Sequence, residues 1–399
     1  MRIFFLILIL IAEKTSFGQG LWTPKADFGG GYRAGTVGFC IGTKGYVGTG
    51  IDNFGNKKND FWEYNPINDS WTQKANFAGA ARYWAVGFSI GNNGYIGSGF
   101  NGSLNTYYND FWKYNPSTNT WSAIANFPGA KRYNAIGFST GSKAYFGIGR
   151  DSSLIFKNDF WEYDTLTNIW TQKNSFAGTA RGPAVVFSIG NNLYVGTGND
   201  SVGPTKDFWE YNTVSNTWIQ KANLPVSRCN ATGFAIGMKG YILTGIDSIN
   251  NTHNDFWEYD IISNNWIQKV NFPGNPRMFA VGFSIGQKGY IGTGDSTGSG
   301  AFLKDFWEYD PNGNSINETN FINSISIFPN PATNHFTIEA KENKIFSLRI
   351  INKFGQKVTE KKFQKKTEVD ISSYNRGLFL IEVCDERCVK CHTEKVLIE

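Results

Sequence analysis

The stretch Asp60-Phe61-Trp62-Glu63-Tyr64 is one copy of a five-residue pattern, Asp-Phe-Trp-(Glu/Lys)-Tyr, that occurs six times in the 399-residue chain. Successive copies begin 48 to 50 residues apart, at Asp60, Asp110, Asp159, Asp207, Asp255 and Asp305. Self-similarity at a period of this length indicates a repeat architecture in which each copy is one structural unit. A tryptophan recurs with the same spacing, at Trp22, Trp71, Trp121, Trp170, Trp218 and Trp266. So does an arginine, at Arg33, Arg82, Arg132, Arg181, Arg228 and Arg277.

Each unit contains the pattern of four short strands. In one unit, an apolar strand at 85–90 is followed by the turn sequence Gly-Asn-Asn-Gly and a second strand at 95–99. A variable polar loop precedes the third strand at 110–115, and Trp121 begins the fourth after a turn that starts with Pro116. Four antiparallel strands form one blade of a β-propeller. The sequence therefore predicts an all-β fold built on six blades.

Composition agrees with this fold class and excludes some partners. The chain has 45 Gly, 33 Phe, 18 Tyr and 13 Trp residues, a balance that favours strands and tight turns. Its net charge of +5 is small, and Lys and Glu are interspersed. No basic stripe points to nucleic acid or to an anionic membrane surface.

The phase of the repeats predicts how the ring closes. The chain starts with a fourth strand at 22–25, whereas the last unit ends with its third strand at 305–310. No tryptophan strand follows Asp310. We therefore expect the N-terminal strand to complete the sixth blade, which leaves no exposed sheet edge.

These repeats resemble the Kelch family. That family has a glycine doublet at the end of the second strand, a Tyr in the third and a Trp that opens the fourth. Here Gly48-Thr49-Gly50 and Gly97-Ser98-Gly99 stand where the doublet is expected, which is a departure from the family pattern. The resemblance covers about 21–310 and implies a six-bladed propeller, but this fold serves many functions.

The first residues read as a signal peptide over 1–18. Met1 and Arg2 supply a basic start, an apolar run covers 3–12, and Ser16 and Gly18 place small residues before Gln19. The run is too short to span a bilayer, so no stable membrane span is expected. A buried N-terminal strand is the alternative interpretation.

The repeat pattern stops after Asp310, and we place the propeller at 19–311, a polar linker at 312–322 and a small β-sandwich domain at 323–399. Phe328-Pro329-Asn330-Pro331-Ala332, then Gly377-Leu378-Phe379, then the terminal Lys395-Val396-Leu397-Ile398 resemble the C-terminal sorting domain of type IX secretion. The resemblance implies the type IX machinery as a partner and a secreted or cell-surface location reached by outer-membrane export. An ordinary β-sandwich accessory domain is the alternative.

Few residues suit metal or redox chemistry. Of the three histidines, only His253 lies in the propeller, which argues against a histidine metal cluster or a Ser-His-Asp triad there. Copper oxidases among the Kelch-type propellers use two histidines, which this propeller lacks. We predict no metal and no cofactor, and leave the catalytic residues, if any, unknown.

The sequence Cys388-Val389-Lys390-Cys391-His392 matches the attachment motif of c-type haem. It lies inside the segment that type IX export would remove, so we favour a second interpretation. Cys384 and Cys388 flank a short turn and could form a disulfide in an oxidising compartment. Cys40 and Cys229 are expected to be small buried residues.

The six arginines precede the first strand of each blade and so share one face with the variable loops. Each could pair with an acidic or carbonyl group between blades, and the Asp or Asn after each second strand could cap a turn. We favour this interpretation because a packing device repeats whereas a ligand site breaks symmetry. The mid-strand Glu63 and its equivalents are expected to pair with fourth-strand lysines such as Lys74 and Lys173.

The residues that do not repeat point to a ligand site on the loop face. Exposed aromatic side chains there suit stacking on a sugar or a peptide, with packing at the rim as the alternative. Together with nearby arginines they give the predicted ligand-binding set: Arg82, Trp84, Tyr107, Tyr108, Arg132, Tyr133, Arg277 and Phe279.

The leading hypothesis is therefore a secreted or cell-surface propeller that binds a glycan or a protein. Whether it is an enzyme stays open, with binding favoured because no catalytic set converges. The alternative is a carbohydrate-active Kelch enzyme that resembles the sialic-acid mutarotases. An adhesin or matrix component comes third. An asymmetric Arg–carboxylate pair at the central mouth would favour the enzyme, and an uneven ring of exposed aromatics would favour binding.

Overall fold

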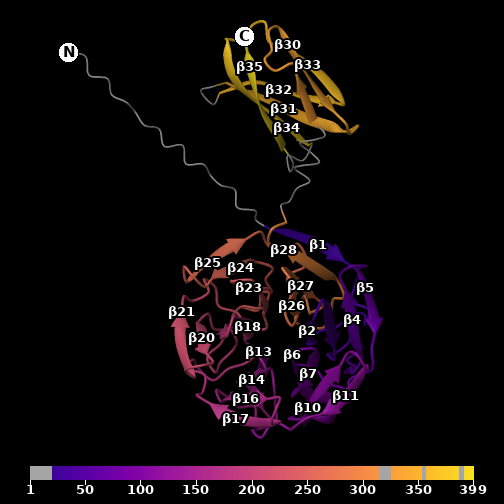
Figure 1. Cartoon of the computed structure of the whole chain (residues 1–399), viewed down its shortest axis with the longest axis vertical. Coiled ribbons are helices and arrows are strands. Elements are labelled where there is room, and N and C mark those ends of the chain that lie inside the picture. The colour runs from indigo at the N-terminus through magenta and orange to yellow at the C-terminus, as the bar shows by residue number, and fades with distance from the viewer. Residues whose placement is uncertain (1–19, 314–324, 353–355, 386–390) are drawn as a thin grey trace, which may run out of the picture. The chain divides into compact units, whose positions relative to one another are not determined.

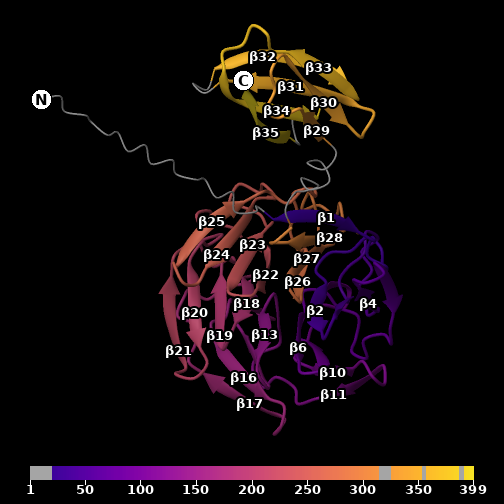
Figure 2. The ribbon, with the colours of Figure 1, turned by 45° about the horizontal axis from the view of Figure 1, so that its top comes forward.

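The computed structural model describes residues 20–313, 325–352, 356–385 and 391–399, and its side chains at 385, 391 and 393 are left out. One compact unit spans Trp22–Pro311 and another contains Asn312–Glu399. The predicted signal peptide at 1–18 and most of the predicted linker at 312–322 lie outside the described residues. Figures 1 and 2 show the first unit as a ring of sheets around a central axis.

Six four-stranded antiparallel sheets form this ring. Five are continuous in sequence, and each strand is four or five residues long. Blade 1 contains β2 (Val37–Ile41), β3 (Lys44–Gly48), β4 (Phe61–Asn65) and β5 (Ser70–Gln73). Blade 2 contains β6 (Val86–Ile90), β7 (Asn93–Gly97), β10 (Phe111–Asn115) and β11 (Thr120–Ala123). Blade 3 contains β13 (Ile136–Thr140), β14 (Lys143–Gly147), β16 (Phe160–Asp164) and β17 (Ile169–Lys173).

Blade 4 contains β18 (Val185–Ile189), β19 (Asn192–Gly196), β20 (Phe208–Asn212) and β21 (Thr217–Lys221). Blade 5 contains β22 (Thr232–Ile236), β23 (Lys239–Leu243), β24 (Phe256–Asp260) and β25 (Asn265–Lys269). Short pieces on the loop side are β8 (Phe100–Asn101), η1 (Gly102–Leu104), β9 (Thr106–Tyr107), β12 (Arg132–Tyr133) and β15 (Arg150–Asp151). The predicted all-β propeller is confirmed, with each predicted strand within two residues of its place.

The sixth blade confirms the predicted closure. It contains β26 (Val281–Ile285), β27 (Lys288–Gly292), β28 (Phe306–Asp310) and the N-terminal β1 (Leu21–Lys25), which pairs with β28. Trp22 of β1 packs its ring 4.9 Å from that of Tyr309 and 5.1 Å from those of Phe256 and Phe272. Strand β1 is thus bound both to the sixth blade and to the fifth.

Aromatic side chains hold neighbouring blades together. Phe61 of blade 1, for example, meets Tyr114 and Trp121 of blade 2 edge-on, with ring centroids 4.9 and 5.0 Å apart. The indole N–H of Trp121 also donates to the carbonyl of Ala75 in the preceding blade. Equivalent bonds join four other blade pairs, whereas the indole nitrogen of Trp22 has no partner among the described residues. Among the described residues, the seam between blades 5 and 6 therefore lacks the indole hydrogen bond that the other five seams have.

The mid-strand glutamates pair as predicted. Lys74 lies 3.5 Å from Glu63, and Lys173 lies 3.5 Å from Glu162. Glu63 also accepts a 2.7 Å hydrogen bond from the Tyr46 hydroxyl, so it links three strands of one blade. Blade 2 has Lys113 at the glutamate position.

The second unit is a small all-β domain whose seven strands share hydrogen bonds in the order β29-β30-β33-β32-β31-β34-β35. They fold over one core that includes Phe336, Phe346 and Ile381. A parallel bridge between Ala332 and Ile398 ties the first turn to the last strand. The strands are β29 (Ile325–Phe328), β30 (His335–Ala340), β31 (Ile345–Ile351), β32 (Lys357–Gln364), β33 (Lys366–Asp370), β34 (Gly377–Asp385) and β35 (Cys391–Ile398).

Candidate functional site

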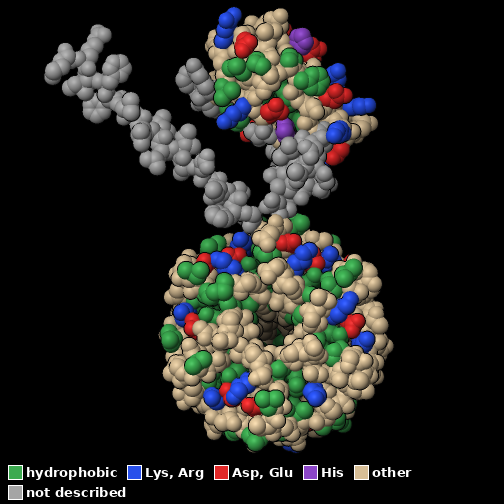
Figure 3. Space-filling model, viewed as in Figure 1, with side chains coloured by type: hydrophobic (Ala, Val, Ile, Leu, Met, Phe, Trp, Pro, Cys, Tyr) green, Lys and Arg blue, Asp and Glu red, His purple; other side chains and the backbone are tan. Residues whose placement is uncertain are grey.

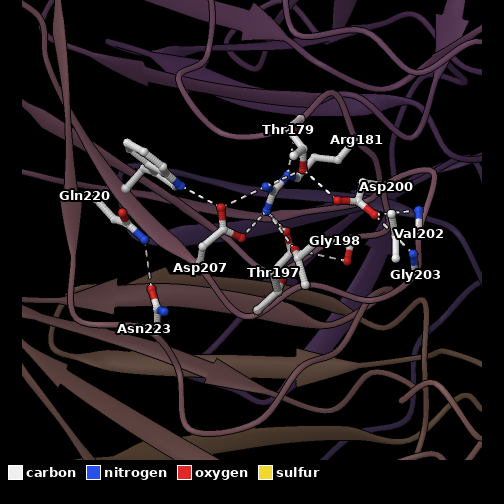
Figure 4. Close-up of polar contacts among 12 residues, drawn as sticks. Thr179, Arg181, Thr197, Gly198, Asp200, Val202, Gly203, Asp207, Gln220 and Asn223 are labelled. Carbon is white, nitrogen blue, oxygen red and sulfur yellow. Dashed lines mark hydrogen bonds and ion pairs between the residues drawn. The ribbon is translucent and has the colours of Figure 1, made fainter.

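The six repeated arginines form a buried layer in which each pairs with the aspartate that begins the Asp-Phe-Trp pattern of its own blade. Arg82 is fully buried, and its two terminal nitrogens lie 2.5 and 2.8 Å from the two carboxylate oxygens of Asp110. Arg181 binds Asp207 in the same forked manner, as Figure 4 shows. A bidentate pair of this kind fixes the guanidinium in one orientation. The pairs are Arg33–Asp60, Arg82–Asp110, Arg132–Asp159, Arg181–Asp207, Arg228–Asp255 and Arg277–Asp305.

The arginines lower the pKa of their partner aspartates. Burial acts to raise the pKa of Asp110, but the hydrogen bonds and the charge of Arg82 outweigh it and hold that pKa below its ordinary value. The same balance lowers the pKa of the equivalent aspartates in blades 3 to 6. The aspartates are therefore ionised and committed to the arginines at neutral pH.

Each arginine also links two blades through its backbone. The carbonyl of Arg82 accepts a 2.8 Å hydrogen bond from the Gly50 amide of blade 1, while its side chain serves blade 2. The prediction that the arginines pair between blades is thus wrong for the side chains, because the partner aspartate belongs to the same blade, and correct only for the backbone. Arg33 also donates to the carbonyl of Thr49, which lies at φ 59° between two glycines.

The acidic residues after the second strands cap turns, as predicted. Asp52 accepts backbone hydrogen bonds of 2.9 Å from Phe54 and Asn56 and lies 2.7 Å from the Lys58 ammonium. Asp151 and Asp247 bind the following turn in the same way. These groups therefore shape the loops.

A ring of six residues surrounds the central channel two positions after each arginine. We call it the mouth ring. It is joined by backbone hydrogen bonds between blades: Trp84 donates to Gly35 at 3.0 Å, and Asn134 donates to Trp84 at 3.2 Å. Gly35 in turn donates to Phe279 at 3.2 Å. Its members are Gly35, Trp84, Asn134, Pro183, Asn230 and Phe279.

The ring holds two large aromatic residues in a strained backbone conformation. Five of the six positions have φ between 52° and 62°, in the left-handed region. Glycine and asparagine tolerate that region, but it is unfavourable for the bulky Trp84 (φ 54°) and Phe279 (φ 56°). Strain of this kind costs on the order of 1 kcal/mol or more and is concentrated at functional sites.

Pro183 interrupts the ring because it has no amide hydrogen and cannot reach positive φ. The link from Pro183 to the carbonyl of Asn134 is therefore missing. So is the next link, from the Asn230 amide to the carbonyl of Pro183. Across the described parts of the chain, no hydrogen bond occupies the Asn134 carbonyl or the Asn230 amide hydrogen. The mouth thus has an aromatic side and an open polar side.

Below the ring lies the channel, a cavity of about 370 Å³ lined by the innermost strands of all six blades. Its lining begins at the residue that follows each ring member, for example Thr36, Ala85 and Ala184. Figure 3 shows the hollow at the centre of the propeller. A ligand that reaches the channel from this end must pass the mouth ring.

The aromatic side of the mouth continues outwards into a cluster. Trp84 lies 5.3 Å from Phe279, and a Cβ on Gly35 would come within 2.9 Å of the indole, so glycine makes room for the Trp84 ring. Trp84 also stacks on Tyr133 at 5.5 Å. Ring contacts of 4.3 to 5.7 Å extend the cluster to Tyr83, Phe100 and Tyr107.

The structure therefore divides the predicted ligand-binding set. It brings Trp84, Tyr107, Tyr133 and Phe279 together in this cluster, but the prediction that they are exposed is wrong: Tyr133 is buried and the other three are half-buried, because their rings pack on one another. Tyr108 instead lies 3.9 Å over the guanidinium of Arg82. Arg82, Arg132 and Arg277 are buried in their aspartate pairs, so we leave them and Tyr108 out of the candidate site.

Sequence reasoning missed Gly35, Tyr83 and Phe100 as site residues and gave no role to the break at Pro183. Counting two residues from each arginine would have aligned the mouth ring in all six blades. The hydrogen bonds of the ring, in contrast, appear only in the structure.

The remaining sequence features concern metals, thiols and haem. Within the described ranges, no group of three or more His, Cys, Asp or Glu could hold a metal ion. Cys229 is buried as predicted, whereas Cys40 is only half-buried, and burial raises the pKa of both thiols to about 11. Cys384 is disulfide-bonded, but its partner and the haem-like motif at 388–392, apart from His392, lie outside the described side chains. Of the described residues, none forms a helix long and apolar enough to cross a membrane.

Comparisons with known proteins agree with both units. A Kelch motif matches residues 99–128, and a secretion system C-terminal sorting domain matches residues 326–399. A solved structure titled "Structure of YjhT" superposes with a TM-score of 0.61 at 16% identity, covering 71% of this chain and 95% of that one, which shows a shared fold. No curated protein matches the chain. The chain therefore combines a Kelch-type β-propeller with a C-terminal sorting domain of type IX secretion, which marks a secreted or cell-surface protein.

Proposed function

We propose that the propeller is a non-catalytic glycan-binding module and that the sugar binds at the mouth ring and the aromatic cluster. The observation that carries the proposal is the strained pair Trp84 and Phe279, two aromatic rings held where glycine or asparagine would be relaxed. Their cluster occupies one side of the mouth only, so it departs from the six-fold symmetry of the scaffold.

The chemistry of the mouth suits a sugar. The apolar C–H face of a pyranose can stack on the half-buried Trp84 and Phe279, whereas its hydroxyl groups need both donors and acceptors. Asn134 and Asn230 offer both from their side-chain amides. Among the described residues, the side-chain nitrogen Nδ2 of Asn230 has only weak contacts, of 3.6 and 3.7 Å, with the sulfur atoms of Cys229 and Met278.

Binding is favoured over catalysis because the mouth ring contains no titratable side chain and the cluster beside it adds only tyrosines. General acid–base chemistry needs a titratable group within reach of the substrate. The nearest repeated charges, such as Arg82 and Asp110, neutralise each other in buried pairs. A sugar mutarotase or another carbohydrate-active enzyme would need such a group at the mouth.

A glycan array probed with the full chain tests the proposal, with a sugar-mutarotation assay run on the same preparation. The variant Trp84→Asn removes the aromatic ring and should keep the backbone, because asparagine already occupies two positions of the same ring. We expect binding by the native chain, much weaker binding by Trp84→Asn and no turnover. Turnover would point to the enzymatic alternative, and equal binding by both chains would place the site elsewhere.

For export, we propose a cleavable signal peptide at 1–18. The domains at 19–311 and 323–399 are joined by the segment 312–322. The sorting-domain match supports it, because a protein must cross the inner membrane before it can use the type IX route. N-terminal sequencing of the secreted protein tests the cleavage site, and a start at Gln19 is expected. A protein that retains Met1 would contradict it.

A further inference from the structure

We infer that the polar side of the mouth, formed by Asn134, Pro183 and Asn230, binds a secondary amide, namely the acetamido group of an N-acetylated sugar. This inference rests on the proposed glycan binding and adds the substituent that the sugar must carry. It follows from the two hydrogen bonds that the mouth ring lacks.

The gap presents one backbone acceptor and one backbone donor. Four of the six possible links of the ring are made, at 3.0 to 3.2 Å, and both missing links involve Pro183. They leave the carbonyl of Asn134 and the amide hydrogen of Asn230 without a hydrogen bond in the described parts of the chain. A secondary amide has the complementary pair, since its N–H can donate to the first and its carbonyl can accept from the second.

Small residues surround this gap. A Cβ on Gly182 would lie 2.7 Å from the Asn134 carbonyl oxygen, so only a glycine can approach that oxygen without a clash. Ala184 and Ala231 follow Pro183 and Asn230 and begin the channel lining there. Their small apolar side chains suit the methyl group of an acetamido substituent.

A sugar fits better than a peptide, although both contain amides. The opposite side of the mouth carries the contact between Trp84 and Phe279, which offers a stacking surface for a pyranose ring. The ring and the channel of about 370 Å³ form a compact opening that accepts the end of a ligand. A peptide would gain most from an extended groove or a free sheet edge, whereas the free edges of the blades belong to their outermost strands, such as β5 and β11, and not to the strands that line the channel.

The test compares two trisaccharides that differ at the 2-position, the β1,4-linked trimer of N-acetylglucosamine and cellotriose, by calorimetric titration of the full chain. We expect the acetylated trimer to bind at least about tenfold more tightly, because two hydrogen bonds are gained. Equal affinity of the two trimers would overturn the amide inference and leave glycan binding intact. No binding of either trimer would count against both.

Pro183→Asn tests the location. Asparagine tolerates positive φ and supplies an amide hydrogen, so it closes the ring as Asn134 and Asn230 do. We expect this variant to bind the acetylated trimer about tenfold more weakly and cellotriose unchanged. Unchanged affinity for the acetylated trimer would overturn the assignment.

Two controls keep that result interpretable. The melting temperature of Pro183→Asn should not fall, and Pro183→Gly serves as the second variant with the same expected loss if the first does not fold. An N-acetylated tripeptide amide is the third ligand. Tighter binding of this peptide than of the acetylated trimer would overturn the choice of a sugar.

Discussion

The arginine layer and the mouth ring lie only two residues apart in every repeat, yet they follow opposite rules. All six arginines are 0–1% exposed and bind the same type of partner in the same geometry. The six ring positions hold five different residue types in one backbone arrangement, and one of them breaks it. Repetition therefore marks the scaffold of this propeller, and the positions that vary on a constant backbone mark its site.

The largest effect is expected from the closing strand. Deleting residues 20–27 removes β1 and the contacts of Trp22 with Phe256, Phe272 and Tyr309. Exposed edges at blade 6 and the lost aromatic packing should abolish the single cooperative unfolding transition. Denaturant unfolding followed by tryptophan fluorescence measures this. An unchanged denaturant unfolding curve would show that the stability of the ring does not depend on its N-terminal strand.

Next is the arginine layer. Arg82→Met leaves the partly buried carboxylate of Asp110, which is 28% exposed, without its partner, and this should lower the free energy of unfolding by about 3 kcal/mol. The matched control is Lys304→Met, which breaks the exposed ion pair with Asp27 and should cost less than about 1 kcal/mol. Urea titrations compare the two. Equal losses would mean that the buried layer is not the scaffold.

The mouth ring should behave in the opposite way. Trp84→Asn is expected to weaken glycan binding by about 2 kcal/mol, or roughly thirtyfold, as for a central aromatic contact. Its effect on stability should be small because relief of the left-handed strain, about 1 kcal/mol, offsets lost ring contacts. Titration and thermal unfolding of the same samples separate the two quantities. A variant as unstable as Arg82→Met would make Trp84 a scaffold residue.

The smallest effect concerns pH. The folded-state pKa of Asp110 lies below its ordinary value, which is about 3.9 in the unfolded chain, so its ionised form stabilises the fold above about pH 4. That stabilisation is lost as the pH falls through the folded-state pKa. The unfolding free energy should therefore decrease more steeply below pH 4 in the native chain than in Arg82→Met. If the unfolding free energy fell with pH at the same slope in both chains, the Arg82–Asp110 pair would not be the cause of the acid sensitivity.

Much of the fold could be predicted from the sequence because its determinants are local and repeated. The phase of Trp22 against Asp305 was enough to predict the closing strand, and the spacing of Glu63 and Lys74 predicted their pairing. The departure at Gly48-Thr49-Gly50 was visible too, but the hydrogen bond from Arg33 to the Thr49 carbonyl was not.

The site was less predictable because sequence does not show where a side chain points. Arg82 and Trp84 both lie on the loop face by topology, but one side chain turns into its blade and the other towards the mouth. Pro183 is visible as a proline, whereas the hydrogen bonds that it removes depend on the neighbouring blades. Tyr83 and Phe100 join the cluster through the short bridge between them, which no residue pattern indicates.

The most direct test is a paired measurement of glycan affinity and unfolding free energy on Arg82→Met and Trp84→Asn in the full chain. We predict that Arg82→Met loses stability while its folded fraction retains native affinity, and that Trp84→Asn loses affinity while its stability stays close to native. The account would be contradicted if both variants lost the two properties together, or if Trp84→Asn bound the glycan as tightly as the native chain.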